Sequence, residues 1–447
     1  MRIEQVGFKD FPPFADGIID FPENINDELA EVHLITGQNG TGKTRLLSAL
    51  AAALGNSSDL DQRHSAQQDH NIIVSMSVYN QTVMFSRSPG QIVVVNKNDR
   101  DDLMAGMMAG AKSPRRMRVQ QGDKVRQINP LKVFKHLFEM RGPSMPFTAQ
   151  AYRGSGRATD HKIAAMQPLK VVDPRANVSF DRATDDDSTI CQAMSNLKMG
   201  AAMESQTGLP VRECRSIQIT QRFEAAIATV TGRPFGFQVR PQPEVHLVVR
   251  WGSSQMKLRE LPDGLRSIIA WLIACIAKLD AQYPEHRDLL DIPLILLLDE
   301  PESHLHPAWQ RQLIPAAQKL FPNAQIFVAS HSPFVISSVN SGWIHVLRTD
   351  ESGLVNADEP KPCSKGDSWI DAVEDVLGVT EWYDPETEAL LTEFRALKRK
   401  TLSERGDLNS LKEKAEAIAS RSESLRSMMA REMHQLQRNM AEAVAEP

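Results

Sequence analysis

A glycine-rich segment that ends in a lysine and a threonine is the clearest chemical feature of this 447-residue chain. The segment Gly37–Thr44, GQNGTGKT, matches G-x-x-x-x-G-K-T and follows the apolar run Val32–Ile35. Backbone N–H groups of such a loop, where it enters a helix, can point at phosphate oxygens. Lys43 adds a charge beside the β- and γ-phosphates, and the Thr44 hydroxyl can ligate Mg²⁺. The predicted nucleotide-binding residues are Gly37, Gln38, Asn39, Gly40, Thr41, Gly42, Lys43, Thr44 and Arg45.

Two adjacent carboxylates end a second apolar run, IPLILLLDE, which is typical of a buried parallel strand. Ligands bind beyond the carboxyl ends of such strands. We therefore expect Asp299 to hold the Mg²⁺ shell and Glu300 to orient or deprotonate the attacking water. His331 follows the next predicted strand, AQIFVAS, and could contact the γ-phosphate from the same edge. The alternatives are two solvent-facing acids at a strand end and a structural histidine.

The elements that must position these groups are predicted to lie in separate parts of the chain. Lys43 and Asp299 are too far apart for a compact P-loop core, so a large insertion must separate them. The insertion contains helical patterns, DSTICQAMSNLKMGAAM and RFEAAIATVTG, and returns through the strand-like FGFQVRPQPEVHLVVRWG. It shows no long heptad pattern. The expected fold is α/β with a mixed sheet, divided into 1–99 (first part of the core), 100–240 (insertion or helical lobe), 241–360 (second part of the core) and 361–447 (helical C-terminal region).

The C-terminal region is predicted to be helical and amphipathic. Asp384 and Pro385 are typical of an N-cap and a first helical residue. Further on, apolar residues recur at three-, four- or seven-residue steps, which indicates one apolar stripe. The stripe could pack against the chain's own nucleotide-binding core, or it could bind a partner, for which its methionines are suited. Its members are Leu408, Leu411, Ala415, Ile418, Leu425, Met429 and Leu436.

Composition and charge limit the class of protein without selecting one. The length allows two or three domains, and 24% charged with 41% hydrophobic residues is typical of a globular chain. The formal net charge is −5, so nucleic-acid contact would need a local patch. Arg115, Arg116 and Arg118 are candidates for it, with a solvated loop as the alternative. Four dispersed cysteines, no signal peptide and no membrane span lead us to expect a cytoplasmic protein.

Four motifs, GQNGTGKT, LPDGLRS, DEPESHLHP and ASHSP, resemble in type and order those of ATP-binding-cassette ATPases of the chromosome-maintenance and recombination-repair type. The resemblance implies an ATPase head, ATP and Mg²⁺ as cofactors, and a head-to-head dimer or higher oligomer with shared ATP sites. LPDGLRS would be the signature that meets the γ-phosphate of the other subunit, through Pro262, Asp263, Gly264 and Arg266. It lacks the serine of the family's Leu-Ser-Gly-Gly-Gln; Arg266 could replace that contact or be merely solvated. Gln150 would be the family's Mg²⁺-sensing glutamine, with core packing as the alternative.

The DEPESHLHP motif has His306 where transporter subunits carry the aspartate of the D-loop. This version resembles the overcoming-lysogenisation ATPases, and LPDGLRSIIAW is more similar still to the PtuA-type ATPase subunits of the Septu and retron-linked defence systems. The resemblance implies a regulatory ATPase that controls an HNH-type nuclease through its C-terminal helices, because this chain shows no nuclease motif of its own. A repair-type ATPase that clamps DNA is the alternative, and a membrane transport motor is disfavoured.

Overall fold

The computed structural model describes residues 2–24, 29–54, 71–78, 81–86, 91–95, 148–153, 187–241, 245–339, 341–363, 369–378, 382–404 and 408–445. The chain forms two compact units, Met1–Ala372 and Val373–Pro447. Within these described ranges, no helix is both long enough and apolar enough to cross a membrane.

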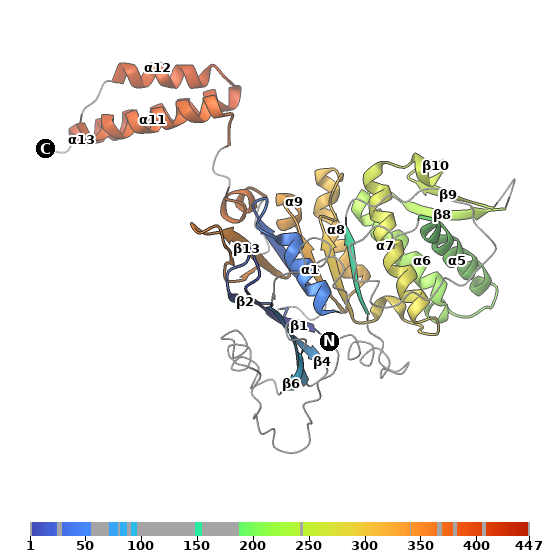
Figure 1. The fold of residues 1–447 in the computed structure, drawn as a ribbon. Coiled ribbons are helices and arrows are strands. Elements are labelled where there is room, and N and C mark those ends of the chain that lie inside the picture. The colour runs from blue at the N-terminus through green and yellow to red at the C-terminus, as the bar shows by residue number, and fades with distance from the viewer. Residues whose placement is uncertain are drawn as a thin grey trace, which may run out of the picture. The chain divides into compact units, whose positions relative to one another are not determined.

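A mostly parallel sheet forms the centre of the larger unit (Figure 1). Strand β11 (Leu294–Asp299) is buried along its whole length, as is β12 (Ala324–Ala329), as expected where both faces of a parallel sheet are covered. Two antiparallel strands at one edge make the sheet mixed, so the α/β prediction is confirmed. The remaining strands are β3 (Glu31–Gly37), β7 (Thr148–Arg153), β13 (Trp343–Thr349), β14 (Val355–Ala357) and β15 (Lys361–Pro362), in the order β14-β13-β3-β12-β11-β7, with β15 also on β13.

Helix α1 (Lys43–Ala53) packs between the central sheet and a second, antiparallel sheet. Its leucines Leu46, Leu47 and Leu50 are fully buried. They share one hydrophobic core with side chains of both sheets. The second sheet consists, in spatial order, of β2 (Gly17–Asp20), β1 (Arg2–Lys9), β4 (Asn71–Val78), β5 (Gln81–Ser86) and β6 (Gln91–Val95).

The helical patterns of the insertion form the predicted helices, which pack with a small antiparallel sheet (Figure 1). The predicted boundary at residue 240 does not follow this structure. The boundary falls between β8 (Phe235–Arg240) and β9 (His246–Trp251) of the small sheet. The predicted range 100–240 also includes β7, which pairs with β11 in the central sheet. The two insertion helices are α5 (Asp187–Ser205) and α6 (Arg215–Thr231), and the small sheet consists of β8, β9 and β10 (Ser254–Met256). The helices that follow in the chain are α7 (Asp263–Gln282), α8 (Pro307–Leu320) and α9 (Pro333–Ile336).

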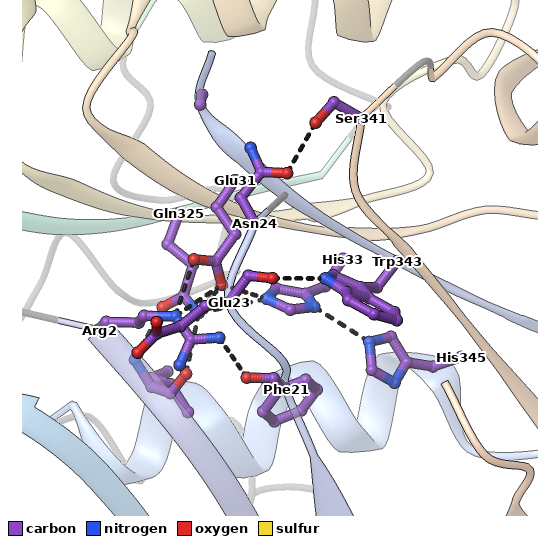
Figure 2. A network of polar contacts seen from close by, with 12 residues as sticks. Arg2, Phe21, Glu23, Asn24, Glu31, His33, Gln325, Ser341, Trp343 and His345 are labelled. Carbon is purple, nitrogen blue, oxygen red and sulfur yellow. Dashed lines mark hydrogen bonds and ion pairs between the residues drawn. The ribbon is translucent and has the colours of Figure 1, made fainter. Parts of the chain in front are cut away.

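A network of buried polar groups joins strands at the amino end of β3 (Figure 2). Gln325 on β12 accepts a hydrogen bond from the N–H of Ile3 and donates to the Ile3 carbonyl and to Glu31. Glu31 also lies 2.5 Å from His33, whose other ring nitrogen lies 3.0 Å from His345 on β13. Because buried polar groups are costly when unpaired, the network fixes β1 to the central sheet.

The smaller unit contains α11 (Pro385–Glu404), α12 (Leu408–Ala419) and α13 (Glu423–Ala445). Asp384 accepts hydrogen bonds from the N–H groups of Glu386 and Thr387, which confirms the predicted N-cap. The apolar stripe, however, is not an open docking face. Its described side chains are buried in a core shared by the three helices, together with Leu391 and Phe394 of α11.

The remaining predictions from the sequence concern basic residues, cysteines and metal ligands. Arg115, Arg116 and Arg118 lie outside the described residues, so the structure does not test a nucleic-acid role for them. The four cysteines form no disulfide with one another. In the described part of the chain, no group of three or more His, Cys, Asp or Glu side chains is arranged to hold a metal ion.

Candidate nucleotide-binding site

The predicted phosphate loop connects β3 to α1 at the carboxyl end of β3. Gln38, Asn39 and Gly40 are exposed at its tip, whereas Thr41 is buried and donates a hydrogen bond to the Gln38 carbonyl. Gly37 has a φ of 144°, and a Cβ atom there would overlap the Leu347 carbonyl oxygen of the neighbouring β13. Only glycine fits this first position of the loop, because a side chain meets both backbone strain and a steric clash.

Lys43, the first residue of α1, extends its side chain back across the loop. Its ammonium group donates to the carbonyl oxygens of Gly37, at 3.0 Å, and Gln38, at 2.8 Å. Burial lowers the pKa of Lys43 to about 8, although the charges of Glu300 and Asp299 act in the opposite direction. The lysine is therefore placed where a nucleotide phosphate would meet the loop, within the field of both carboxylates.

Asp299, at the end of β11, joins Thr44 to a third residue. The Thr44 hydroxyl donates to Asp299 Oδ1 at 3.0 Å, and Arg153 Nε lies 3.1 Å from Oδ2. The Asp299 side chain is almost buried, with 6% of its surface exposed. A hydroxyl and a carboxylate are the hard oxygen ligands that Mg²⁺ prefers. Thr44 and Asp299 therefore fit the predicted metal site.

Glu300 directly follows the strand and lies at the surface. Its carboxylate is half exposed, and its Oε1 lies 3.8 Å from His331 Nε2. The backbone φ of Glu300 is 49°, a left-handed conformation that is uncommon for a side-chain-bearing residue and is often found at functional sites. Burial, followed by the charge of Lys43, lowers the pKa of His331. A neutral imidazole near pH 7 therefore faces the predicted base.

A buried glutamate in the same loop was not singled out from the sequence. Glu302 accepts a hydrogen bond from the Ser330 hydroxyl, and the Ser330 N–H donates to the Ile35 carbonyl of β3. Burial raises the pKa of Glu302 to about 7. These contacts connect the segments that carry Glu300 and His331, so Glu302 supports the position of both.

The candidate signature begins α7. Pro262 is the N-cap and Asp263 the first helical residue. Arg266 contacts Asp263 at 3.2 Å, and only 16% of its side chain is exposed. The arginine therefore has a partner within its own helix turn and is not simply solvated. Gly264 lies against the chain segment after β11, where a Cβ atom would come within 2.8 Å of the His304 carbonyl oxygen.

His306 and Arg45, two of the predicted site residues, each contact a neighbouring part of the chain. His306 is the N-cap of α8, where its Nδ1 accepts a hydrogen bond from the N–H of Ala308 at 3.2 Å. The Arg45 guanidinium lies 4.4 Å from the centre of the Phe11 ring, a cation–π arrangement. Arg45 thus packs against an aromatic ring of the core, and its assignment to nucleotide binding stays a prediction.

Gln150 lies on β7, and its hydrogen bonds are to Tyr152 and Cys275 rather than to Thr44 or Asp299. Its side chain is fully buried in β7, accepts a hydrogen bond from the Tyr152 hydroxyl and donates to the Cys275 carbonyl at 3.4 Å. This placement agrees with the alternative of core packing, and the Mg²⁺-sensing role stays a prediction. Arg153, three residues further on, is the β7 residue that contacts Asp299, and sequence reasoning missed this role. Side chains alternate along a strand, so positions 150 and 153 face opposite sides of the sheet.

Comparison with protein-family models identifies the class of the site. A model described as "AAA domain" matches residues 5–138, and one described as "AAA domain, putative AbiEii toxin, Type IV TA system" matches residues 151–337. The chain therefore carries AAA ATPase sequence in both segments that build the candidate site. The predicted ATPase domain is confirmed.

The chain is similar to ATPases of defence systems. It is 32% identical over 105 residues to the "Retron Ec83 probable ATPase" of Escherichia coli, covering 24% of this chain and 19% of that protein. It is 25% identical over 153 residues to the "Septu protein PtuA" of Bacillus thuringiensis, covering 33% of this chain and 39% of that protein. The predicted resemblance to these two groups is confirmed, although the chain spans well under half the length of each relative.

Solved structures give a weaker likeness. The "SmcHead bound to the C-winged helix domain of ScpA" is 12% identical, with 81% of this chain and 98% of that chain covered and a TM-score of 0.46.

Proposed function

We propose that this chain binds Mg²⁺ and ATP at the loop between β3 and α1 and hydrolyses the nucleotide. The observation that carries this proposal is the 3.0 Å hydrogen bond from Thr44 to Asp299, two residues far apart in the sequence. It brings the phosphate loop and the end of β11 together as one site, with Lys43 beside them. The AAA matches on both segments support it.

The chemistry would be shared among a few side chains. Lys43 and the loop N–H groups bind and orient the phosphates, and Thr44 with Asp299 would hold Mg²⁺, which neutralises charge on the transferred phosphoryl group. Glu300 accepts a proton from the attacking water, for which its exposed carboxylate is suited. His331, kept neutral by burial, can donate a hydrogen bond to the γ-phosphate.

The exposed signature residues suggest how a second copy of the chain would contribute. Pro262 and Asp263 are exposed at the start of α7, and Asp263 holds Arg266. In a head-to-head dimer, Arg266 would leave Asp263 to reach the γ-phosphate bound by the other subunit. We therefore propose that ATP closes such a dimer, alone or within a higher oligomer of dimers.

Two variants test the site. Lys43→Ala should abolish binding of ATP, whereas Glu300→Gln should bind ATP, fail to hydrolyse it and accumulate as a closed dimer. Bound nucleotide and molar mass are measured by size-exclusion chromatography with light scattering, with and without Mg²⁺ and ATP. If Glu300→Gln hydrolyses ATP at the wild-type rate, the assignment of the base is wrong.

The likeness to PtuA and retron ATPases supports a role in antiphage defence. We propose that the chain is the regulatory subunit of a complex with an HNH-type nuclease, acts in the cytoplasm and uses its C-terminal helices for docking. Because their apolar stripe is buried within the unit, docking would use the exposed charged residues of α11, α12 and α13.

Affinity purification of the full chain from its native locus tests this partner, with a chain ending at Ala372 as the comparison. That end point removes the smaller unit completely, so no apolar face of α11 is left exposed. A nuclease that copurifies only with the full chain supports the proposal. If both chains instead come down without a protein partner and retain DNA, the repair-type clamp replaces it.

A further inference from the structure

We propose that Arg153 is a positioning residue that holds the Asp299 carboxylate and competes with a divalent cation for it. Metal binding and the release of Arg153 would then be coupled events. This inference rests on the proposed function, because it concerns the metal that accompanies ATP at the same site.

The backbone pairing of the sheet fixes the contact between the two residues. Strands β7 and β11 are parallel, and their register places Arg153 directly beside Asp299 at the last position of each strand. Directly paired side chains on one face of a sheet are close neighbours. The contact is therefore built into the central sheet.

Asp299 needs a counter-charge because it is almost buried. An ionised carboxylate in that environment is costly unless a cation or several hydrogen bonds compensate it. Lys43 directs its ammonium group to the loop carbonyls, so among the described residues it is Arg153 that forms an ion pair with Asp299. Arg153 is 30% exposed, which leaves its guanidinium room to move toward solvent.

The two carboxylate oxygens of Asp299 have different partners. Thr44 donates to Oδ1 and Arg153 contacts Oδ2. A divalent cation held by Thr44 and Asp299 would thus lie beside a guanidinium group, and the two positive charges would repel each other. Either the divalent cation binds more weakly than it would without the charge of Arg153, or Arg153 moves away from Asp299 when the cation binds. Both outcomes make metal affinity depend on the charge of residue 153.

The test measures the affinity of the full-length protein for Mn²⁺ in saturating ADP, by electron paramagnetic resonance of free Mn²⁺. Arg153→Gln removes the competing charge and should bind Mn²⁺ about tenfold more tightly than wild type. Arg153→Lys keeps the charge and should stay close to wild type. Arg222→Gln is the matched control, because Arg222 pairs with Asp291 at similar exposure away from the site, and it should change nothing.

Thermal unfolding provides a second measurement. Without nucleotide, Arg153→Gln leaves Asp299 without its counter-charge and should melt at a lower temperature than wild type. Addition of Mn²⁺ and ADP should then raise its melting temperature by more than it raises that of wild type, because the metal replaces the lost charge.

Three results would overturn the proposal. Weaker Mn²⁺ binding by Arg153→Gln would show that Arg153 contacts phosphate or supports the metal directly. Unchanged affinity with a lower melting temperature would show a purely structural ion pair, and unchanged values of both would show no role. Failure of the proposed function is recognised separately, because wild type would then bind ADP no better than Lys43→Ala.

Discussion

Gly264 at the start of α7 and the carbonyl group of His304 lie so close that a Cβ atom on Gly264 would come within 2.8 Å of the oxygen. The first turn of the signature helix therefore packs directly against the segment that follows Glu300. The same added atom would lie 2.8 Å from Leu305. A displacement of one segment is expected to move the other, because closely packed backbone cannot be compressed.

We expect Gly264→Ala to destabilise the larger unit by about 1–3 kcal/mol, the usual cost of forcing an extra group into a packed site. Chemical denaturation of the two proteins measures the difference. Gly17→Ala is a suitable control, because the nearest atom to a Cβ there lies 4.0 Å away. Equal stability of Gly264→Ala and wild type would mean that the two segments separate easily.

The affinity for ATP should fall as pH rises above about 8. The pKa of Lys43 without nucleotide is about 8, lowered by burial from an ordinary value of 10.5, and only the protonated amine pairs with phosphate. The expected fall is up to about tenfold per pH unit. Titration with a fluorescent ATP analogue between pH 7 and 9.5 measures it. Lys43→Arg keeps its charge throughout this range, so any binding that it retains should vary less with pH.

The polar network should make the protein sensitive to acid. Burial, followed by the neighbouring His33, lowers the pKa of His345 well below its ordinary value of 6.5. The unfolded chain therefore binds more protons than the folded chain below that value, and the stability from neutral His345 is present above pH 6.5 and lost as pH falls. Urea unfolding between pH 7 and 5 should show a shallower decline for His345→Gln than for wild type. His434→Gln, at an exposed position, should behave as wild type does.

The core of the smaller unit should be separable from nucleotide binding. Leu411 is fully buried among α11, α12 and α13, so Leu411→Ala should cost about 2–5 kcal/mol in that unit. Because residues 1–372 form their own compact unit, ATP affinity should stay at the wild-type value. Hydrogen exchange of α12 measures the loss, and the exposed substitution Lys412→Ala is the control. A parallel loss of ATP affinity would show that the two units depend on each other.

Sequence patterns located the parts of the site that follow strands. The phosphate loop after Val32–Ile35, Asp299 and Glu300 after their apolar run, and His331 after the next run could all be predicted, because buried parallel strands are continuous apolar segments. The structure brings Thr44, Asp299, Glu300 and His331 to one edge of the sheet.

The missed features depend on which elements become neighbours. Strand β7 is short and follows a long, weakly patterned stretch, so nothing local indicated that it lies beside β11 and brings Arg153 to Asp299. The C-terminal stripe predicted a buried face correctly, but a single-helix pattern does not say what covers it. Its partners proved to be the neighbouring helices of the same unit.

The pairing of β7 with β11 also has an evolutionary consequence. Insertions and deletions before or after Thr148–Arg153 can change the length of the chain without altering which residues face each other. A deletion of one residue within the strand would instead turn every following side chain to the opposite face and take Arg153 away from Asp299. Homologous chains are therefore expected to differ widely in length outside this strand, while its six positions keep a constant spacing.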